Sequence, residues 1–471
     1  MTERFLSQDA CRDLLQRVIR LSTGGGEVQI SVRSRWTGNL RWARNESTSS
    51  GDTTAHNINI TRFIRGASAS ASTNQIDDES LRACIRRAEL RILYRTPDPD
   101  APPLRSAETY IKTNLWNDET FGLDADARAG IQLKIVEPAV AEQLFSFGYL
   151  EITAVGNGVM NSAGLFAYLP QTRAEFSVTV RNPKATGSGW AGTENNDWRK
   201  IDAEKVTARA IEKCKSSANP VAIEPGRYTV ILEPQAVGDL MEPLVRSLIR
   251  PPAEMGQGPW ADRADEIEEQ TNPMSEIAST LSTRPTQGGG SSRIGKRVLD
   301  ARITISADPA DPDAPFVPFA FDTLPYRAVK WIEAGVLKEL SYPRQYALST
   351  LNRSDPLNNS GAFRMTGGPT SVDEMIAATG RGILITRLTN VHTIIAESLF
   401  CGGTTSDGLW LVEHGKISRP LKNFRFRESP LFAFNNIEAI GAPERVLLDM
   451  PSICPPIKAR DFSLTSLADA I

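Results

Sequence analysis

Hydrophobic residues recur at helical spacing near the start of the chain. After Ser7, a residue type favoured at helix N-caps, apolar residues follow the i, i+3, i+4 pattern at Cys11, Leu14, Leu15, Val18 and Ile19. Strand-like runs continue to residue 72, and a second amphipathic segment starts at Asp77. This order predicts a compact α+β domain of residues 1–98. A proline-stiffened linker is expected at 95–105.

Residues 106–222 are predicted to form a central domain. A helix is expected from Asp124 to Gln143, with an interruption near Pro138. Alternating residues between 149 and 183, with Gly-Asn-Gly and Asn-Ser at the turns, predict a meander of strands. The segment 202–217 then reads as a capped helix.

The remaining residues, 224–471, predict a domain rich in strands. Its segment 251–292 is rich in Gly, Pro, Ser and acidic residues, which is typical of a long surface excursion and makes it a candidate for partner or substrate contact. One short helix is expected around 326–337. The predicted fold class is α+β, with an N-terminal α/β region followed by a large, mainly antiparallel β C-terminal domain.

Composition and charge narrow the class of protein. The chain has 471 residues, 40% of them hydrophobic, and a net charge of −3, so charge gives no reason to expect nucleic acid or an anionic membrane as a partner. No apolar run reaches the ~20 residues that span a bilayer, and charges stand where a signal peptide would have its apolar core. Five widely spaced cysteines favour buried thiols in a reducing cytoplasm over disulfides.

A helix predicted after the strand-like run 226–232 carries acidic residues in its first turns. Its apolar positions form one stripe: Val237, Leu240, Met241, Leu244, Val245 and Leu248. At about 100° per residue, Asp239, Glu242 and Arg246 are expected on the opposite, outward face, with Glu242 and Arg246 as an i,i+4 ion pair. Pro243 is expected to bend the helix or to delay its start. The pattern alone predicts a packing helix.

The segment from Gly290 to Arg297 nearly fits a phosphate-binding loop, G-x-x-x-x-G-K-[ST], but Arg297 stands where the metal-binding hydroxyl belongs. Such a loop also needs a strand before it and a helix after it. Here a glycine- and serine-rich stretch precedes and a strand-like run follows. A flexible loop entering a strand is therefore favoured over a nucleotide site.

Histidine is scarce, with only three residues in the chain. His414 falls in a turn pattern, and His392 lies in a strand-like apolar run that Cys401 ends. Structural roles are the common ones for such histidines. His392, Cys401 and Cys454 could instead converge on a metal ion, a possibility that spacing alone leaves open.

Several stretches together resemble the TldD/PmbA family of metallopeptidases and their non-catalytic partners. The resemblance covers nearly the whole chain and rests on the order and spacing of "NINITRFIRGASASASTNQIDDESLRACIRRAEL", "NSAGLFAYLPQTRAEFSVTV", "PGRYTVILEP", "GGGSSRIGKRVLDARITISADP", "AVKWIEAGVLKEL" and "GLWLVEHGKISRPLKNFRFRESPLFAFNNIEAIG". None of these is a short catalytic signature.

In the metallopeptidase branch, the resemblance implies H-E-x-x-x-H on the helix after "VILEP", with a further cysteine ligand near the C-terminus. Here Glu242 and Pro243 stand about where the first histidine and the glutamate would be, and Ser247 where the second histidine would be. Serine is a poor zinc ligand and proline is none. Cys454 lies beside "PPIKARDF" rather than in a glycine-rich context, so no ligand role is assigned to it.

The resemblance therefore implies a pseudo-enzyme: a TldE-like subunit without a catalytic site of its own, which helps to form the peptide-binding chamber of a metalloprotease complex that processes unfolded peptides. Zinc is expected only in a catalytic partner. The chain is expected to be a homodimer or a heterodimer with an H-E-x-x-x-H relative. Extended peptides suit it because they can pair with strand edges. The alternative is a self-standing homodimeric peptide-binding protein, or a hydrolase with a non-standard metal site.

Overall fold

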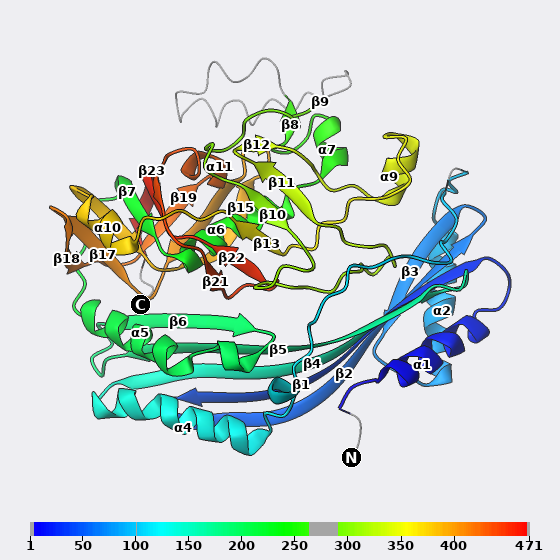
Figure 1. Cartoon of the computed structure of the whole chain (residues 1–471), viewed down its shortest axis with the longest axis horizontal. Coiled ribbons are helices and arrows are strands. Elements are labelled where there is room, and N and C mark those ends of the chain that lie inside the picture. Colours follow the sequence, from blue (N-terminus) through cyan, green and yellow to red (C-terminus); the bar gives the residue numbers. More distant parts are fainter. Residues whose placement is uncertain (1–3, 100, 263–290, 469–471) are drawn as a thin grey trace.

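The computed structural model describes residues 4–99, 101–262 and 291–468. Figure 1 shows an N-terminal region built on very long strands and a C-terminal region of shorter strands that lies against it. The N-terminal region is α/β. The C-terminal region, from Gly226 onward, is large, rich in strands and mostly antiparallel, which confirms the predicted fold class.

The N-terminal region is organised by one six-stranded sheet of order β3-β2-β1-β4-β5-β6. All neighbouring strands are antiparallel, and their bounds are β1 Glu27–Ala43, β2 Glu46–Ile64, β3 Ala67–Thr73, β4 Phe145–Asn161, β5 Phe166–Arg181 and β6 Ser188–Asn195. Strands β1 to β3 come from the predicted domain 1–98 and β4 to β6 from the predicted domain 106–222. Because β1 pairs with β4 along 14 residues, the two predicted segments share a single sheet.

Helices cover one face of this sheet. They are α1 Gln8–Leu21, α2 Asp78–Ile92, α3 Asp118–Phe121, α4 Ala125–Ala141 and α5 Ala203–Ser216, with a 3-10 turn at Trp198–Lys200. Ser7 and Asp77 are the N-caps of α1 and α2, as expected. The Ser7 hydroxyl accepts a hydrogen bond from the backbone N–H of Ala10, and the Asp77 carboxylate accepts one from the backbone N–H of Ser80. Helix α4 runs through Pro138 to Ala141, so the interruption expected there is not found.

The C-terminal region contains a nine-stranded sheet and a second, smaller six-stranded sheet. The larger has the order β15-β16-β19-β23-β7-β14-β17-β18, with β20 beside β23: β7 Gly226–Leu232, β14 Arg381–Ile385, β15 Leu388–Ile395, β16 Phe400–Thr405, β17 Leu409–Glu413, β18 Lys416–Pro420, β19 Phe424–Glu428, β20 Ile437–Ile440 and β23 Ile457–Leu467. The smaller has the order β12-β11-β10-β13-β22-β21: β10 Ile305–Ala307, β11 Val329–Glu333, β12 Val336–Leu337, β13 Phe363–Met365, β21 Glu444–Val446 and β22 Ser452–Cys454.

The prediction of a short helix at 326–337 is wrong, because this segment forms the β11–β12 hairpin. Its turn is Ala334-Gly335, with φ of 49° and 76°. A tight hairpin turn needs positive φ at both central residues, which glycine supplies readily. A Cβ at position 335 would also lie 2.1 Å from the carbonyl oxygen of Leu299. The remaining short helices are α6 Pro234–Arg246, α7 Arg250–Glu254, α9 Arg344–Ser349, α10 Val372–Ala377 and α11 Pro430–Ala433.

The predicted surface excursion at 251–292 lies largely outside the described residues. Its ends are described: α7 leads to β8 (Ala261–Asp262), which pairs with β9 (Ser291–Ser292). The predicted linker at 95–105 contains no regular strand, and Arg105 Nη2 donates to Asp355 Oδ1 of the C-terminal region at 2.6 Å. Among the described residues, no helix is both long and apolar enough to cross a membrane.

Candidate functional site

Helix α6, the helix with the predicted acidic face, begins directly after β7 in the middle of the nine-stranded sheet. Pro234 occupies its first turn, where a missing N–H costs nothing. The preceding residue, Glu233, accepts hydrogen bonds from Lys213 Nζ at 2.7 Å and from Arg209 Nη2 at 2.9 Å, both on α5. Burial lowers the pKa of Lys213, and the Glu233 carboxylate opposes that shift. This ion pair fixes the start of α6 against the N-terminal region.

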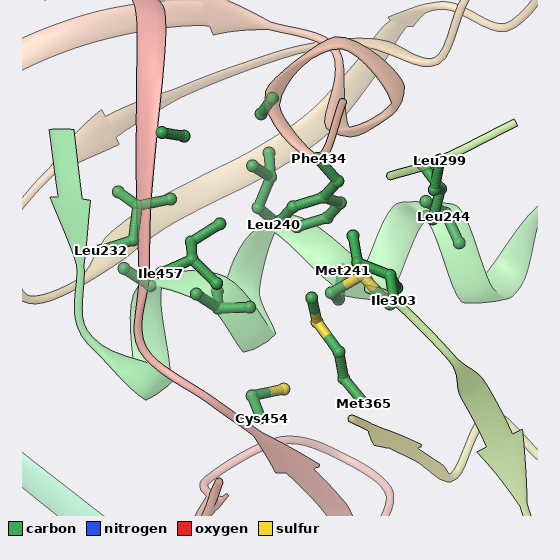
Figure 2. Packing of buried hydrophobic residues seen from close by; sticks show 14 of the residues in the cluster. Leu232, Leu240, Met241, Leu244, Leu299, Ile303, Met365, Phe434, Cys454 and Ile457 are labelled. Carbon is green, nitrogen blue, oxygen red and sulfur yellow. The ribbon is translucent and has the colours of Figure 1, made fainter. Parts of the chain in front are cut away.

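The predicted apolar stripe of α6 is confirmed. Val237, Leu240, Met241, Leu244 and Val245 on the helix, and Leu248 two residues beyond its end, are all at most 1% exposed. Figure 2 shows this side of the helix packed against Leu232, Leu299, Ile303, Met365, Phe434 and Ile457. The stripe thus lies at the centre of the largest hydrophobic core of the C-terminal region.

The expectation that Asp239 faces outward is wrong. Its carboxylate accepts from the backbone N–H of Leu388 and from Gln235 Nε2, both at 2.8 Å. Burial raises the pKa of Asp239 to about 7. The 100° rule places a side chain relative to its own helix but cannot show that the start of β15 covers that side. Asp239 therefore joins α6 to β15.

Glu242 and Arg246 form the predicted i,i+4 ion pair, with Arg246 Nη2 2.6 Å from Glu242 Oε1. Arg246 is 61% exposed, so the pair lies on a solvated face and contributes little stability. Pro243 neither delays nor breaks the helix, which starts at Pro234 and ends at Arg246, one turn after the proline.

Ser247 has a structural role at the end of α6. Its hydroxyl donates to the carbonyl of Leu244 at 2.7 Å. The indole N–H of Trp260, a nearly fully buried side chain, donates to both the carbonyl and the hydroxyl oxygen of Ser247. These bonds hold the chain after α6 against the helix.

Cys454 lies beside α6, in β22. Its side chain is fully buried in the same core as Met241 and Met365 (Figure 2). Burial raises its thiol pKa well above the usual range, and the Asp239 carboxylate adds to this effect. A zinc ligand would have to be the thiolate. Pro243 and Ser247, which stand where the resemblance would put a glutamate and a histidine, supply no good zinc ligand, so Cys454 has no set of ligands beside it that fits a zinc ion.

His392 and Cys401 are brought to neighbouring strands but not to one site. His392 pairs in register with Gly402, and Thr393 with Cys401, so the histidine and cysteine side chains point to opposite faces of the sheet. His392 is exposed and Cys401 fully buried. Cys454 belongs to the other sheet. Within the described residues, no three His, Cys, Asp or Glu side chains form a group that could hold a metal ion. His414 occupies the β17–β18 turn with φ 51°.

The segment that nearly fits a phosphate-binding loop begins at Gly290, which lies outside the described residues. From Ser291 on, the segment forms β9 and then turns at Gly295. Lys296 Nζ lies 2.6 Å from Asp262 Oδ1, and Arg297 Nη1 donates to the carbonyl of Ala334. No helix follows between residues 291 and 328. A phosphate-binding loop needs such a helix and a free lysine, and this segment has neither.

A second polar feature covers the face of the N-terminal sheet opposite its helices, called here the polar face. Across its strands Asn39, Glu151, Glu175 and Glu194 stand in one row. Like charges directly opposite one another destabilise a sheet, so these carboxylates need cations beside them.

Arginines supply that compensation unevenly. Glu194, 1% exposed, accepts from Arg173 Nε at 3.0 Å and from Arg445 Nε at 2.8 Å. Glu151 pairs with Arg35. Within the described part of the chain, the one ion pair of Glu175 is a 3.6 Å contact to Arg173 Nη2. Burial raises the pKa of Glu175, and the neighbouring glutamates add to the shift. Glu175 is thus the least satisfied carboxylate of the row.

The polar face was missed by the sequence reasoning. Its signal is a two-residue period along β1, where Arg35, Thr37, Asn39 and Arg41 alternate with residues such as Trp36 and Leu40. That alternation shows which residues share a face. It does not show that three glutamates from three different strands meet in one row.

The fold, with α6 packed in the core after a central strand, defines a metallopeptidase-related class of protein when it is compared with known proteins. Residues 225–466, just over half of the chain, match the PmbA/TldA metallopeptidase C-terminal domain. The chain therefore belongs to the TldD/PmbA family.

Solved structures of similar fold span nearly the full length. A Thermotoga maritima protein described as a candidate modulator of a DNA gyrase has a TM-score of 0.76 at 17% identity, over 96% of this chain and 100% of its own. TldE from Thermococcus kodakarensis has a TM-score of 0.75 at 16% identity, over 96% of this chain and 99% of its own. A Bacteroides thetaiotaomicron protein, likewise described as a candidate modulator of DNA gyrase, has a TM-score of 0.77 at 14% identity, over 98% of this chain and 100% of its own. No curated protein sequence matches the chain.

Proposed function

We propose that this chain is a non-catalytic, TldE-like subunit that pairs with an H-E-x-x-x-H relative and forms part of the chamber in which that relative processes unfolded peptides. One observation carries the proposal. The helix in the place of the family's metal-binding helix has its polar residues committed to structure, with Ser247 bonded to Trp260 and Asp239 to the start of β15. Zinc would then be bound by the catalytic partner only.

The polar face supports the chamber part of the proposal. It is a broad surface of Asn, Thr, Glu and Arg side chains on rigid strands, and most of these side chains remain partly exposed. Its side chains can form hydrogen bonds and ion pairs with the polar groups of an extended peptide. Five buried, unpaired cysteines are typical of a reducing compartment, and we also propose a cytoplasmic location.

The test is to express the chain with a co-encoded H-E-x-x-x-H relative, purify the pair and measure cleavage of an unfolded peptide. Association and a rise in cleavage over the relative alone are expected. Glu175→Lys should raise the KM for the peptide with kcat unchanged, because a wall residue contributes binding and not chemistry. Glu242→Ala, on the solvated side of α6, is the matched control and should change neither.

Two results would contradict the proposal. One is that the chains neither associate nor affect peptide cleavage. The other is near-stoichiometric zinc or iron in the chain purified alone, lost in His392→Ala or Cys401→Ala, which would favour the alternative of a self-standing hydrolase with a non-standard metal site. Peptide binding by a homodimer without any relative would favour a self-standing binding protein.

A further inference from the structure

Strand β1 carries an arginine on the polar face that lacks an acidic partner. On the same face of this strand, Arg35 pairs with Glu151, and the guanidinium of Arg41 lies over the ring of Tyr149 at 4.7 Å. Arg33 lies two residues before Arg35, and its side chain remains accessible to solvent. In the part of the chain that the structure describes, no carboxylate forms an ion pair with Arg33.

The strand register places Arg33 between two asparagines. Asn57 of β2 and Asn157 of β4 lie directly opposite it, and the Cβ atoms of such pairs are roughly 5 Å apart. Asn157 is held in place, because its amide donates to the carbonyl of Leu169 at 3.3 Å and to Gln171 Oε1 at 3.4 Å. The residues on either side of Arg33 are therefore polar but cannot neutralise its charge.

The neighbouring charges disfavour the charged form of Arg33. Burial lowers its pKa, and the guanidinium groups of Arg35 and Arg173 lower the pKa further. The C-terminal region lies close to this end of β1, since Gln29 Nε2 donates to the carbonyl of Phe321 at 3.3 Å. A partly desolvated cation beside like charges, without an anion of its own, costs stability, and such groups are typical of functional sites.

A single carboxylate suits Arg33 better than a polyanion does. A guanidinium group binds a carboxylate through two parallel hydrogen bonds. The glutamate row begins at Asn39, six residues and about 20 Å further along β1. That row would repel a nucleic acid or a polyphosphate lying along the face. The main chain of a peptide is uncharged, so a peptide can bring one carboxylate to Arg33 and neutral or basic side chains to the row.

We propose that Arg33 binds a carboxylate of a peptide held on the polar face, either that of an Asp or Glu side chain or that of the C-terminus of the peptide. The ligand supplies the anion that Arg33 lacks. Because the glutamate row repels the same group, the carboxylate also determines which part of the peptide lies at which end of the face. This inference rests on the function proposed above, since it takes the polar face to be the wall that holds the peptide.

Three unstructured peptides of equal length, each with a blocked N-terminus, test the proposal. The first has one Glu and an amidated C-terminus. The second has Gln in its place and a free C-terminal carboxylate, and the third has Gln and an amide. Binding to the full chain is followed by fluorescence anisotropy. At least one carboxylate peptide should bind about tenfold more tightly than the neutral one, which is ~1.4 kcal/mol. The peptide that does so identifies the source of the carboxylate.

Arg33→Gln should abolish this preference and leave binding of the neutral peptide unchanged, because it removes the cation without breaking an ion pair of the described chain. Arg86→Gln is the matched control. It removes the same charge from an exposed arginine of α2, on the helical side of the sheet, and should keep the preference. Arg33→Glu should reverse the preference, so that a peptide with Lys in the place of Glu binds more tightly. A merely structural role of Arg33 would not produce this reversal.

Three results would overturn the inference: equal binding of the three peptides, no binding of any of them, or a preference that persists in Arg33→Gln. Cleavage by the complex with an H-E-x-x-x-H relative is measured separately. Binding that depends on Arg33 without any cleavage would contradict the proposed function alone. Cleavage of all three peptides with the same KM would contradict the role of Arg33 alone.

Discussion

Helices α6 and α4 both have apolar residues in regular positions, but the fold uses them in opposite ways. On α6 the apolar stripe is buried at 1% exposure or less, and Asp239 and Ser247 are bonded to neighbouring segments. On α4 the apolar residues extend around the helix, and Leu133 and Val140 remain exposed. The apolar residues of α6 thus stabilise the core of the C-terminal region, whereas α4 keeps two large apolar side chains exposed to solvent.

The largest effect should come from opening the core around α6. Leu244→Ala removes a fully buried side chain at the centre of that core and should cost about 2–5 kcal/mol of unfolding free energy. Leu133→Ala, the matched change on α4, should stay within about 0.5 kcal/mol. Urea unfolding of both variants measures the difference. Equal costs would mean that Leu133 is covered in the folded chain itself.

The same contrast exists within the glutamate row of the polar face. Glu194→Gln weakens two ion pairs of a carboxylate that is 1% exposed, and the expected cost is about 1.5–3 kcal/mol. Glu175→Gln should be neutral or stabilising by up to ~1 kcal/mol at pH 7, because it relieves repulsion between opposite glutamates. Unfolding free energies at pH 7 compare the two. A larger cost for Glu175→Gln would refute the unequal compensation described above.

Features that lie within one helix or strand could be predicted from the sequence, and features that depend on distant segments could not. Periodicity located α1, α2, α5 and the α6 stripe correctly, because each depends on neighbours within one helix. It found only parts of the long strands, because it split β1, missed the first half of β2 and placed a turn at Gly156–Gly158, which lies inside β4. It failed for Asp239 and for the β11–β12 hairpin. The first depends on β15, about 150 residues further on, and the second on a turn that packs against Leu299. The glutamate row likewise depends on strand register, which no single strand specifies.

A smaller effect should appear in the pH dependence of stability. The pKa of Asp239 is raised to about 7 by burial, with Gln235, Leu388 N and Arg387 opposing the shift and Glu242 adding to it. Between its unfolded pKa of about 4 and 7 the folded state holds the proton more tightly. This contribution to stability is therefore complete below pH 4 and is lost as the pH rises to 7.

Asp239→Asn removes that titration. Its cost relative to wild type should be largest near pH 4 and should shrink by roughly 3–4 kcal/mol by pH 7.5, since the shift of about three units corresponds to about 1.4 kcal/mol per unit. Urea unfolding of both proteins at several pH values gives the difference, in which other buried acids such as Glu428 cancel. A cost that is flat with pH would mean that Asp239 ionises normally and that α6 is less enclosed than its hydrogen bonds indicate.

The smallest effect is expected at the position where the resemblance would put catalysis. Glu242 makes an exposed i,i+4 pair with Arg246, and such pairs contribute about 0.3–0.5 kcal/mol. Glu242→Ala should cost no more than this and should leave peptide cleavage by a complex with an H-E-x-x-x-H relative unchanged. Arg246→Ala, which also removes the exposed pair of Arg246 with Asp449 at 3.1 Å, should cost slightly more but stay below about 1 kcal/mol. A loss of cleavage in Glu242→Ala alone would show that this carboxylate acts on substrate, and α6 would then be an active-site helix after all.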